Sequence, residues 1–138
     1  METVQAKDAH LYLNKPKRHK FGAKKCEIDG HKFASKAEGE RYCELKILYT
    51  QGLIRNLRIQ PRYELYAGIK YVGDFEYDRR LIATASYPGL PGADASADFR
   101  GWERVTEDVK GVLTPVFKIK AKLFAEKYGR KIEIVKSR

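Results

Sequence analysis

Two carboxylates lie inside or at the end of predicted apolar strands, Asp74 within residues 71–75 and Asp108 within residues 107–111. Burying a carboxylate is costly unless a partner compensates its charge. If these two converge from adjacent strands, a hard divalent cation with oxygen ligands is the evident partner. Mg²⁺ suits such a site, because it takes only one or two carboxylates together with waters and phosphate oxygens. The pattern predicts a magnesium site.

Lys110 follows Asp108 by two residues, and in a strand this spacing puts both side chains on one face. A lysine beside a bound cation can orient an attacking water and offset charge that builds on a phosphate. The spacing alone leaves an alternative open, because Asp-X-Lys is a common tripeptide. In that alternative Asp74 is an edge-strand charge, and Asp108 and Lys110 form an exposed cross-strand pair.

Two helices are expected to flank the strands. Asp29 and Gly30 predict a hairpin turn within residues 24–34, and Ser35 with Glu38 has the spacing of a capping box. The first helix should end near Gly52. Its predicted apolar stripe is Tyr42, Leu45, Leu48 and Tyr49. The second helix should begin at Thr114 and Pro115 and end at Gly129, with the apolar stripe Phe117, Ala121, Phe124 and Tyr128.

Strands are predicted over residues 57–65, 69–77, 103–109 and 131–135, with a turn at Ala67 and Gly68. In the second of them one face should carry Ile69, Tyr71, Gly73, Phe75 and Tyr77. Residues 79–101 are rich in proline and glycine and predict a long loop or hairpin tip. The order of hairpin, helix, three strands, helix and strand indicates an α/β fold with a sheet flanked by helices.

The charge of the chain favours an anionic partner. The formal net charge is +10, from 28 Lys and Arg against 18 Asp and Glu. A small protein this basic most often binds nucleic acid. Cys26 and Cys43 fit neither a disulfide framework nor zinc spacing, and both are expected to be buried. No signal peptide or membrane-spanning stretch is evident, so a cytoplasmic protein without membrane association is expected.

Several linked segments then resemble one family, the phage-encoded nucleases of the PD-(D/E)XK superfamily that are related to Holliday-junction resolvases. The resemblance spans roughly residues 24–135 and rests on residues 33–38 with 41–45, 60–65, 69–77, 107–111, 117–118, 123–124 and 128–129. It implies a restriction-endonuclease-like core with the order α-β-β-β-α-β. Residues 1–23 are polar and basic and predict an N-terminal arm. The resemblance implies a nuclease domain over 24–138, and the insertion 79–101 departs from the family, which usually joins the strands of Asp74 and Asp108 by a short hairpin.

The resemblance also implies the site. The strand-end acid of the family falls on Asp74, its second acid on Asp108, its lysine on Lys110 and the acid of its first helix on Glu38. The metal, Mg²⁺ or Mn²⁺, would bind Asp74, Asp108 and Glu38. Glu38 has a second explanation in the capping box. The insertion ends in a second Asp-Phe pair, so that Asp98 is a rival for the place of Asp74.

Basic residues outside this site predict contacts with DNA phosphates. The candidates lie in the arm, before the first helix, after the second strand and on the second helix: Lys17, Arg18, Lys20, Lys36, Arg79, Arg80, Lys118, Lys120 and Lys122. For the helix, a solvated amphipathic face is an equally good explanation.

The expected activity is hydrolysis of DNA phosphodiesters. The resemblance implies branched DNA, such as a Holliday junction, as the substrate, and a homodimer, because a resolvase cuts two strands. If the protein is phage-encoded, it would act in the cytoplasm of the host cell. The alternative from another class is a basic nucleic-acid-binding module without catalysis, whose carboxylates serve in ion pairs.

Overall fold

The computed structural model describes residues 25–82 and 99–137, which belong to two compact units, residues 1–36 and 37–138. The first unit contains an antiparallel hairpin of β1 (Cys26–Ile28) and β2 (His31–Phe33). Asp29 and Gly30 connect its strands with φ values of 53° and 77°. Two positive φ values are what a type I′ turn requires, so the predicted hairpin is confirmed. The predicted arm over residues 1–23 lies outside the described residues.

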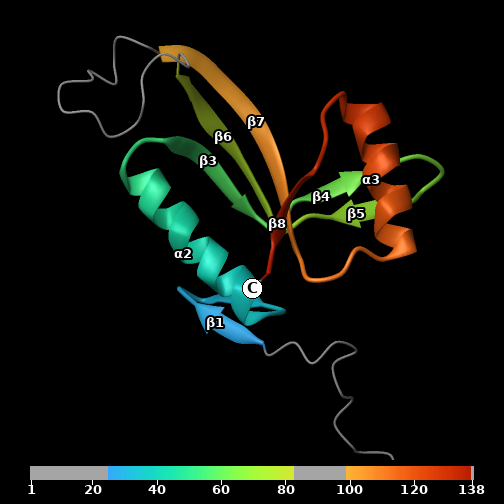
Figure 1. The fold of residues 1–138 in the computed structure, drawn as a ribbon, viewed down its shortest axis with the longest axis horizontal. Coiled ribbons are helices and arrows are strands. Elements are labelled where there is room, and N and C mark those ends of the chain that lie inside the picture. The colour runs from blue at the N-terminus through green and yellow to red at the C-terminus, as the bar shows by residue number, and fades with distance from the viewer. Residues whose placement is uncertain (1–24, 83–98, 138) are drawn as a thin grey trace, which may run out of the picture. The chain divides into compact units, whose positions relative to one another are not determined.

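The second unit is built on a mixed sheet with the strand order β3-β6-β7-β8 (Figure 1). Its strands are β3 (Ile54–Ile59), β6 (Phe75–Ile82), β7 (Phe99–Lys110) and β8 (Glu133–Lys136). The pairs β3–β6 and β6–β7 are antiparallel, whereas β7 and β8 are parallel. A parallel pair needs a crossover, which α3 supplies. With α2 (Lys36–Thr50) and α3 (Pro115–Tyr128), the core order is α2-β3-β6-β7-α3-β8, in agreement with the predicted α-β-β-β-α-β.

Two predicted strands are wrong in the same way, because each is interrupted. The segment 57–65 divides into β3 and β4 (Arg62–Glu64), and 69–77 divides into β5 (Lys70–Val72) and β6. The amide of Gln60 donates to the carbonyl of Asp74 at 2.9 Å, and the amide of Gly73 donates to the carbonyl of Pro61 at 3.0 Å. These bonds hold the two interruptions opposite each other, so β4 and β5 leave the main sheet together as a separate two-stranded sheet.

The small β4–β5 sheet packs against α3 through aromatic side chains. Tyr63 and Tyr71 stack with centroids 5.9 Å apart, and Phe124 of α3 meets them edge-on at 5.0 and 6.0 Å. The buried cluster consists of Tyr63, Leu65, Tyr71, Phe117, Phe124 and Ile132. Thr114 caps α3 and accepts from the amide of Phe117, and Gly129 ends the helix at φ 68°. The predicted boundaries of this helix are therefore confirmed.

Other expectations about burial and loops are wrong in part. In α2 the buried residues are Gly39, Tyr42 and Leu45, whereas Tyr49 is 56% exposed, so the predicted stripe stops short. Cys43 is also exposed, on the solvent side of this helix, and neither cysteine forms a disulfide. The predicted loop 79–101 is shorter than expected, because β6 continues to Ile82 and β7 begins at Phe99. Residues 83–98 lie outside the described residues.

Phe124 is fully buried at the centre of the aromatic cluster. We expect Phe124→Ala to lower the free energy of unfolding by about 3–5 kcal/mol, because it removes a large buried ring and leaves a cavity. Urea denaturation measures this change. Ile119→Ala on the same helix is the control, since Ile119 is 59% exposed and should cost under about 1 kcal/mol. Equal losses in both variants would contradict this description of the core.

Candidate active site

The register of β6 and β7 brings Asp74 and Asp108 together. Phe75 pairs with Glu107 and Glu76 with Thr106, so the same register extended by one residue puts Asp74 opposite Asp108. The amide of Asp74 donates to the carbonyl of Glu107 at 3.0 Å. In return, the amide of Val109 donates to Oδ2 of Asp74 at 2.6 Å. The two carboxylates predicted to converge therefore do so, and the backbone of β7 fixes one of them.

Asp108 lies on the side of the sheet where Lys110 meets Phe117 of α3 and Tyr71 of the small sheet reaches Asp108, and we call this the α3 face. Its carboxylate is buried, and the hydroxyl of Tyr71 donates to Oδ2 at 2.6 Å. The other oxygen, Oδ1, accepts no hydrogen bond, but it lies 3.2 Å from Nζ of Lys110. Lys110 Nζ also lies 4.8 Å from the ring centroid of Phe117. Asp108 and Lys110 are thus a pair on one face, as predicted, and not an exposed cross-strand pair.

Three carboxylates share the electrostatic environment of this site. Burial raises the pKa of Asp74 well above its ordinary value, and the charges of Asp108 and Glu38 raise it further. The hydrogen bond from the amide of Val109 opposes this shift. Glu38 lies in the first turn of α2. The carboxylates disfavour one another's charged form, so a cation bound among them would stabilise the site.

The donor set fits a hard divalent cation. Asp108 of β7 and Asp74, directly before β6, offer carboxylate oxygens, and Oδ1 of Asp108 is buried with no hydrogen bond and only the ion pair to Lys110 at 3.2 Å. Across residues 25–82 and 99–137, no group of three or more His, Cys, Asp or Glu side chains stands in a metal-holding arrangement. Mg²⁺ does not need such a cage, because it keeps several waters and binds through one or two carboxylates.

An ion pair that the sequence did not suggest fixes α2 on the opposite side of the sheet, the α2 face. Arg41 donates from Nε and Nη2 to the two oxygens of Glu107 at 2.8 and 2.7 Å. Glu107 is 1% exposed and also accepts from the hydroxyl of Tyr77. These hydrogen bonds raise the pKa of the Arg41 guanidinium. Because Arg41 follows Glu38 by less than one helical turn, the ion pair positions the helix end that carries Glu38.

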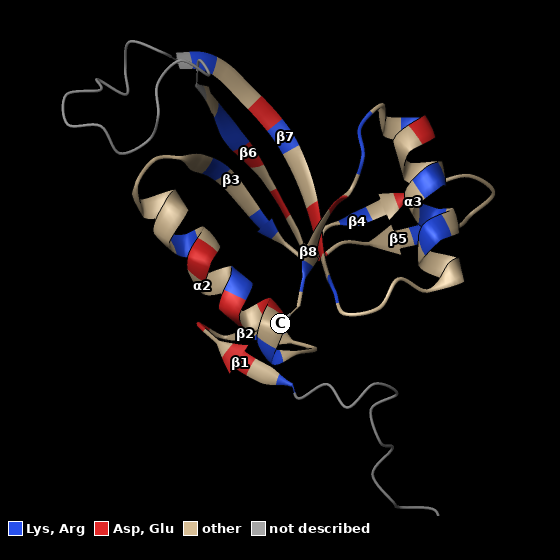
Figure 2. Cartoon of the chain, in the orientation of Figure 1, with Lys and Arg blue, Asp and Glu red and all other residues tan. Residues whose placement is uncertain are grey.

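The predicted phosphate contacts have different surroundings. Lys36, Lys118 and Lys122 are exposed, whereas Lys120 and Arg80 are half-buried. Figure 2 shows Lys and Arg along α3 and on the strands of the main sheet. Arg79 donates to both Glu103 and Glu133, so its charge is balanced by two acids. Lys17, Arg18, Lys20 and the rival acid Asp98 lie outside the described residues.

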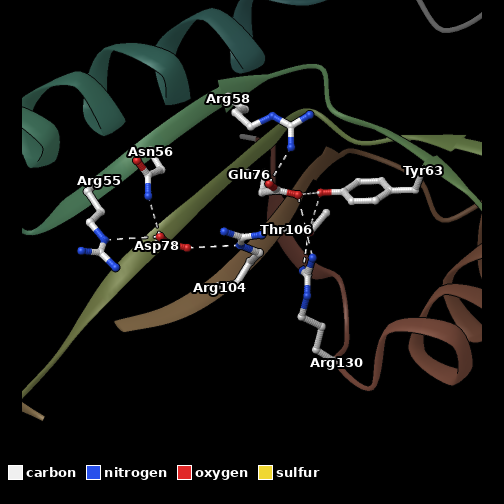
Figure 3. Close-up of polar contacts among 9 residues, drawn as sticks. All are labelled: Arg55, Asn56, Arg58, Tyr63, Glu76, Asp78, Arg104, Thr106 and Arg130. Carbon is white, nitrogen blue, oxygen red and sulfur yellow. Dashed lines mark hydrogen bonds and ion pairs between the residues drawn. The ribbon is translucent and has the colours of Figure 1, made fainter. Parts of the chain in front are cut away.

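Sequence reasoning also missed a second polar cluster on the α3 face. Glu76 and Asp78 are buried, at 4% and 6% exposure, and arginines surround them (Figure 3). The arginines are Arg55, Arg58, Arg104 and Arg130. A signal was present in the sequence, because Glu76 and Asp78 follow Asp74 at two-residue intervals and therefore share one face of β6.

The described residues thus define a small α/β protein with a mixed four-stranded sheet, in which Asp74, directly before β6, lies beside the strand that carries Asp108 and Lys110. Residues 18–138 match the family described as Protein of unknown function (DUF1064), and the chain belongs to that family. Comparisons with curated proteins and with solved structures gave no match. In the described part of the chain, no helix has the length and apolar character needed to cross a membrane.

The Arg41–Glu107 ion pair yields a stability prediction. We expect Arg41→Ala to cost about 3–5 kcal/mol of unfolding free energy, because it leaves the Glu107 charge buried without its cation. Glu44→Ala removes only the outer partner of Arg41, a 62% exposed carboxylate, and should cost under about 1 kcal/mol. Urea denaturation of both variants provides the comparison. Similar costs would show that Glu107 does not depend on Arg41.

Asp78 yields a prediction about pH. Burial disfavours its charge, but hydrogen bonds from Asn56 and Arg104 outweigh this and lower the pKa of Asp78 below its usual 3.8. A lowered pKa stabilises the fold above the ordinary value, and this stabilisation is lost as the pH falls through the folded-state value. We expect Asp78→Asn to lower the melting temperature more at pH 7 than at pH 3. A deficit that stays constant between these pH values would contradict the shift.

Proposed function

We propose that this protein is a metal-dependent nuclease that hydrolyses DNA phosphodiester bonds through a PD-(D/E)XK site. One observation carries the proposal: Asp74, directly before β6, stands opposite Asp108 of β7 when the strand register is extended by one residue, and Nζ of Lys110 lies 3.2 Å from Oδ1 of Asp108. The core order α2-β3-β6-β7-α3-β8 supports it, as does the net charge of +10. The finer assignment to a restriction-endonuclease-like fold rests on this order and on the resemblance of the sequence.

Asp74 and Asp108 would hold Mg²⁺ or Mn²⁺, with Glu38 as a third carboxylate near them. Such an ion, when bound, polarises phosphoryl oxygens and makes water a better nucleophile at neutral pH. The protein supplies the orientation of its own carboxylates. The amide of Val109 holds Oδ2 of Asp74, and the hydroxyl of Tyr71 holds Oδ2 of Asp108. Rigid carboxylates lower the entropic cost of assembling the site.

Lys110 places a positive charge where negative charge develops during phosphodiester hydrolysis. Its ammonium group lies between Asp108 and the ring of Phe117, and the side chain is 34% exposed. The group is therefore held in place and still reaches solvent, where a phosphate or an attacking water can accept its hydrogen bond. Stabilisation by a pre-oriented cation is one of the larger contributions to catalysis of this kind.

The sequence resemblance supports branched DNA as the substrate. It also supports a homodimer as the active assembly. Two cuts placed symmetrically across a junction need two active sites related by a two-fold axis. The basic side chains exposed on α3, Lys118 and Lys122, would contact the backbone without reading bases.

The proposal is tested by cleavage of labelled DNA in Mg²⁺, Mn²⁺ or EDTA. The substrates are a four-way junction, linear duplex and single strand. We expect metal-dependent cutting that falls at least about a hundredfold in Asp74→Asn, Asp108→Asn and Lys110→Met, because each loses a metal ligand or a cation at the reacting phosphate. Glu126→Gln on α3 is the control for loss of an exposed acid and should cut at the wild-type rate.

The variants must also be shown to fold, since Asp108 is buried. Their melting temperatures are measured alongside cleavage. If the wild-type protein binds DNA but cuts none of the substrates with either metal, the enzyme proposal fails and a non-catalytic binding module replaces it. Cleavage that persists in folded Asp108→Asn would move the active site elsewhere in the chain.

A further inference from the structure

Arginines continue along the α3 face from the proposed catalytic carboxylates. Arg55 and Arg104 both pair with Asp78, from either neighbouring strand, at 3.4 and 3.2 Å. Arg58 pairs with Glu76 at 3.0 Å. We propose that Arg55, Arg58 and Arg104, the arginine row, bind the phosphates of the DNA strand that enters the active site. This inference rests on the proposed nuclease function and names a binding surface for its substrate.

The pairing of the strands places the arginine row on the same face as Asp108, further along β6 from Asp74. Arg58 stands opposite Glu76 and Arg55 opposite Asp78 across β3 and β6, while Arg104 stands opposite Asp78 across β6 and β7. Residues opposite each other share a face, so these positions lie on the same face as Asp108. Two residues of strand rise roughly 7 Å and four rise roughly 13 Å. Arg58, opposite Glu76, therefore lies roughly 7 Å from Asp74 along β6, and Arg55 and Arg104, opposite Asp78, lie roughly 13 Å from it.

Buried acids orient these arginines without using all their hydrogen-bond donors. Glu76 and Asp78 are almost completely buried, but the side chains of Arg55, Arg58 and Arg104 are 51%, 61% and 55% exposed. Arg55 and Arg104 reach Asp78 through Nε, and Arg58 reaches Glu76 through one terminal nitrogen. A guanidinium has five N–H donors, so each retains donors directed toward solvent.

Further contacts keep the row rigid. The guanidinium carbon of Arg55 lies 4.3 Å from the ring centroid of Trp102. Asn56 donates a third hydrogen bond to Asp78 at 2.9 Å, and the hydroxyl of Tyr63 donates to Glu76. Figure 3 shows the arginines approaching Asp78 and Glu76 from both neighbouring strands. Arginines that are already oriented lose less entropy when they bind a phosphate than mobile lysines do.

The charge balance leaves the row cationic. The three arginines of the row contribute three positive charges against the two acids Glu76 and Asp78, and Arg130, outside the row, adds a fourth beside Glu76. Guanidinium groups match phosphate oxygens in a two-pronged geometry, which a row of them repeats at intervals. A polyanion with regularly spaced phosphates fits this arrangement. The position of the row, in line with Asp74 and Asp108, favours the substrate strand over an acidic peptide.

Binding is measured by fluorescence polarisation of a labelled duplex in EDTA, where no cleavage occurs, at several salt concentrations. We expect Arg55→Gln and Arg58→Gln each to weaken binding about fivefold to tenfold near 0.1 M salt, and to lower the salt slope by about 1. Arg58→Lys keeps the charge but loses the oriented two-pronged geometry, so it should keep the wild-type salt slope and recover only part of the affinity. Lys46→Gln is the matched control, because it removes one charge from α2, which lies on the other face, and should change affinity less than about twofold.

A second measurement locates the contact. Single uncharged methylphosphonates are placed about two and four nucleotides from the cut, which matches the strand distances at 3.4 Å per nucleotide. Each methylphosphonate should weaken DNA binding by the wild-type protein. The one about two nucleotides from the cut should hardly change the affinity of Arg58→Gln, and the one about four nucleotides away should hardly change that of Arg55→Gln. Melting temperatures are recorded for every variant. If a glutamine variant does not fold, the corresponding lysine variant is measured instead with the same methylphosphonate DNA.

The outcomes separate the two proposals. If the row variants bind as tightly as wild type while wild type cuts DNA, the row proposal fails alone. If the row variants lose affinity but wild type cuts nothing, the nuclease proposal fails and the binding surface stands. Competition by poly-glutamate as strong as that by DNA of equal charge would overturn the choice of nucleic acid as the occupant.

Discussion

The two-pronged ion pair between Arg41 and Glu107 is the constraint on which the second unit of this protein depends. Glu107 is buried between residues that face the opposite way, so one strand, β7, carries a structural acid on one face and a catalytic candidate on the other. The pair ties α2 to the centre of the sheet. It therefore sets where Glu38 stands relative to Asp74. A buried charge that loses its partner is costly, which makes this arrangement hard to shift.

Because side chains alternate along the strands, the two faces of the sheet carry different kinds of residue. Phe75, Tyr77 and Val105 pack on the α2 face together with Glu107, and this face holds the sheet to its helix. The α3 face carries Asp108, Glu76 and Asp78, whose charges are met by lysine, arginine and tyrosine side chains. So many buried acids cost stability unless each has a partner. Their concentration on one face, each acid with a cationic or hydroxyl partner, is the feature on which the proposed site rests.

The interruption at Gln60–Pro61 and Gly73–Asp74 couples the site to the aromatic core. It releases β4 and β5 from the main sheet, so Tyr71 reaches Asp108 and Tyr63 reaches Glu76 from the small sheet beside α3. Burial, and then the charge of Asp108, raise the pKa of Tyr71, which keeps its hydroxyl protonated as a donor. A Cβ on Gly73 would lie 3.3 Å from the Thr106 side chain, so the backbone at Gly73 passes close to β7. Core packing and site geometry thus share the same residues.

Interactions between residues close together in the chain specify the local features. The hairpin at Asp29 and Gly30, the boundaries of α3 and the Asp108–Lys110 spacing follow from turn preferences, capping and two-residue periodicity, which act over a few residues. The positions where the strands break depend on long-range contacts, because Gln60 and Asp74 meet through a backbone hydrogen bond across fourteen residues of chain. The partners of Glu107, Glu76 and Asp78 also come from distant parts of the chain. Alternation shows which side chains share a face, but the identity of the neighbouring strand and helix depends on long-range pairing and burial.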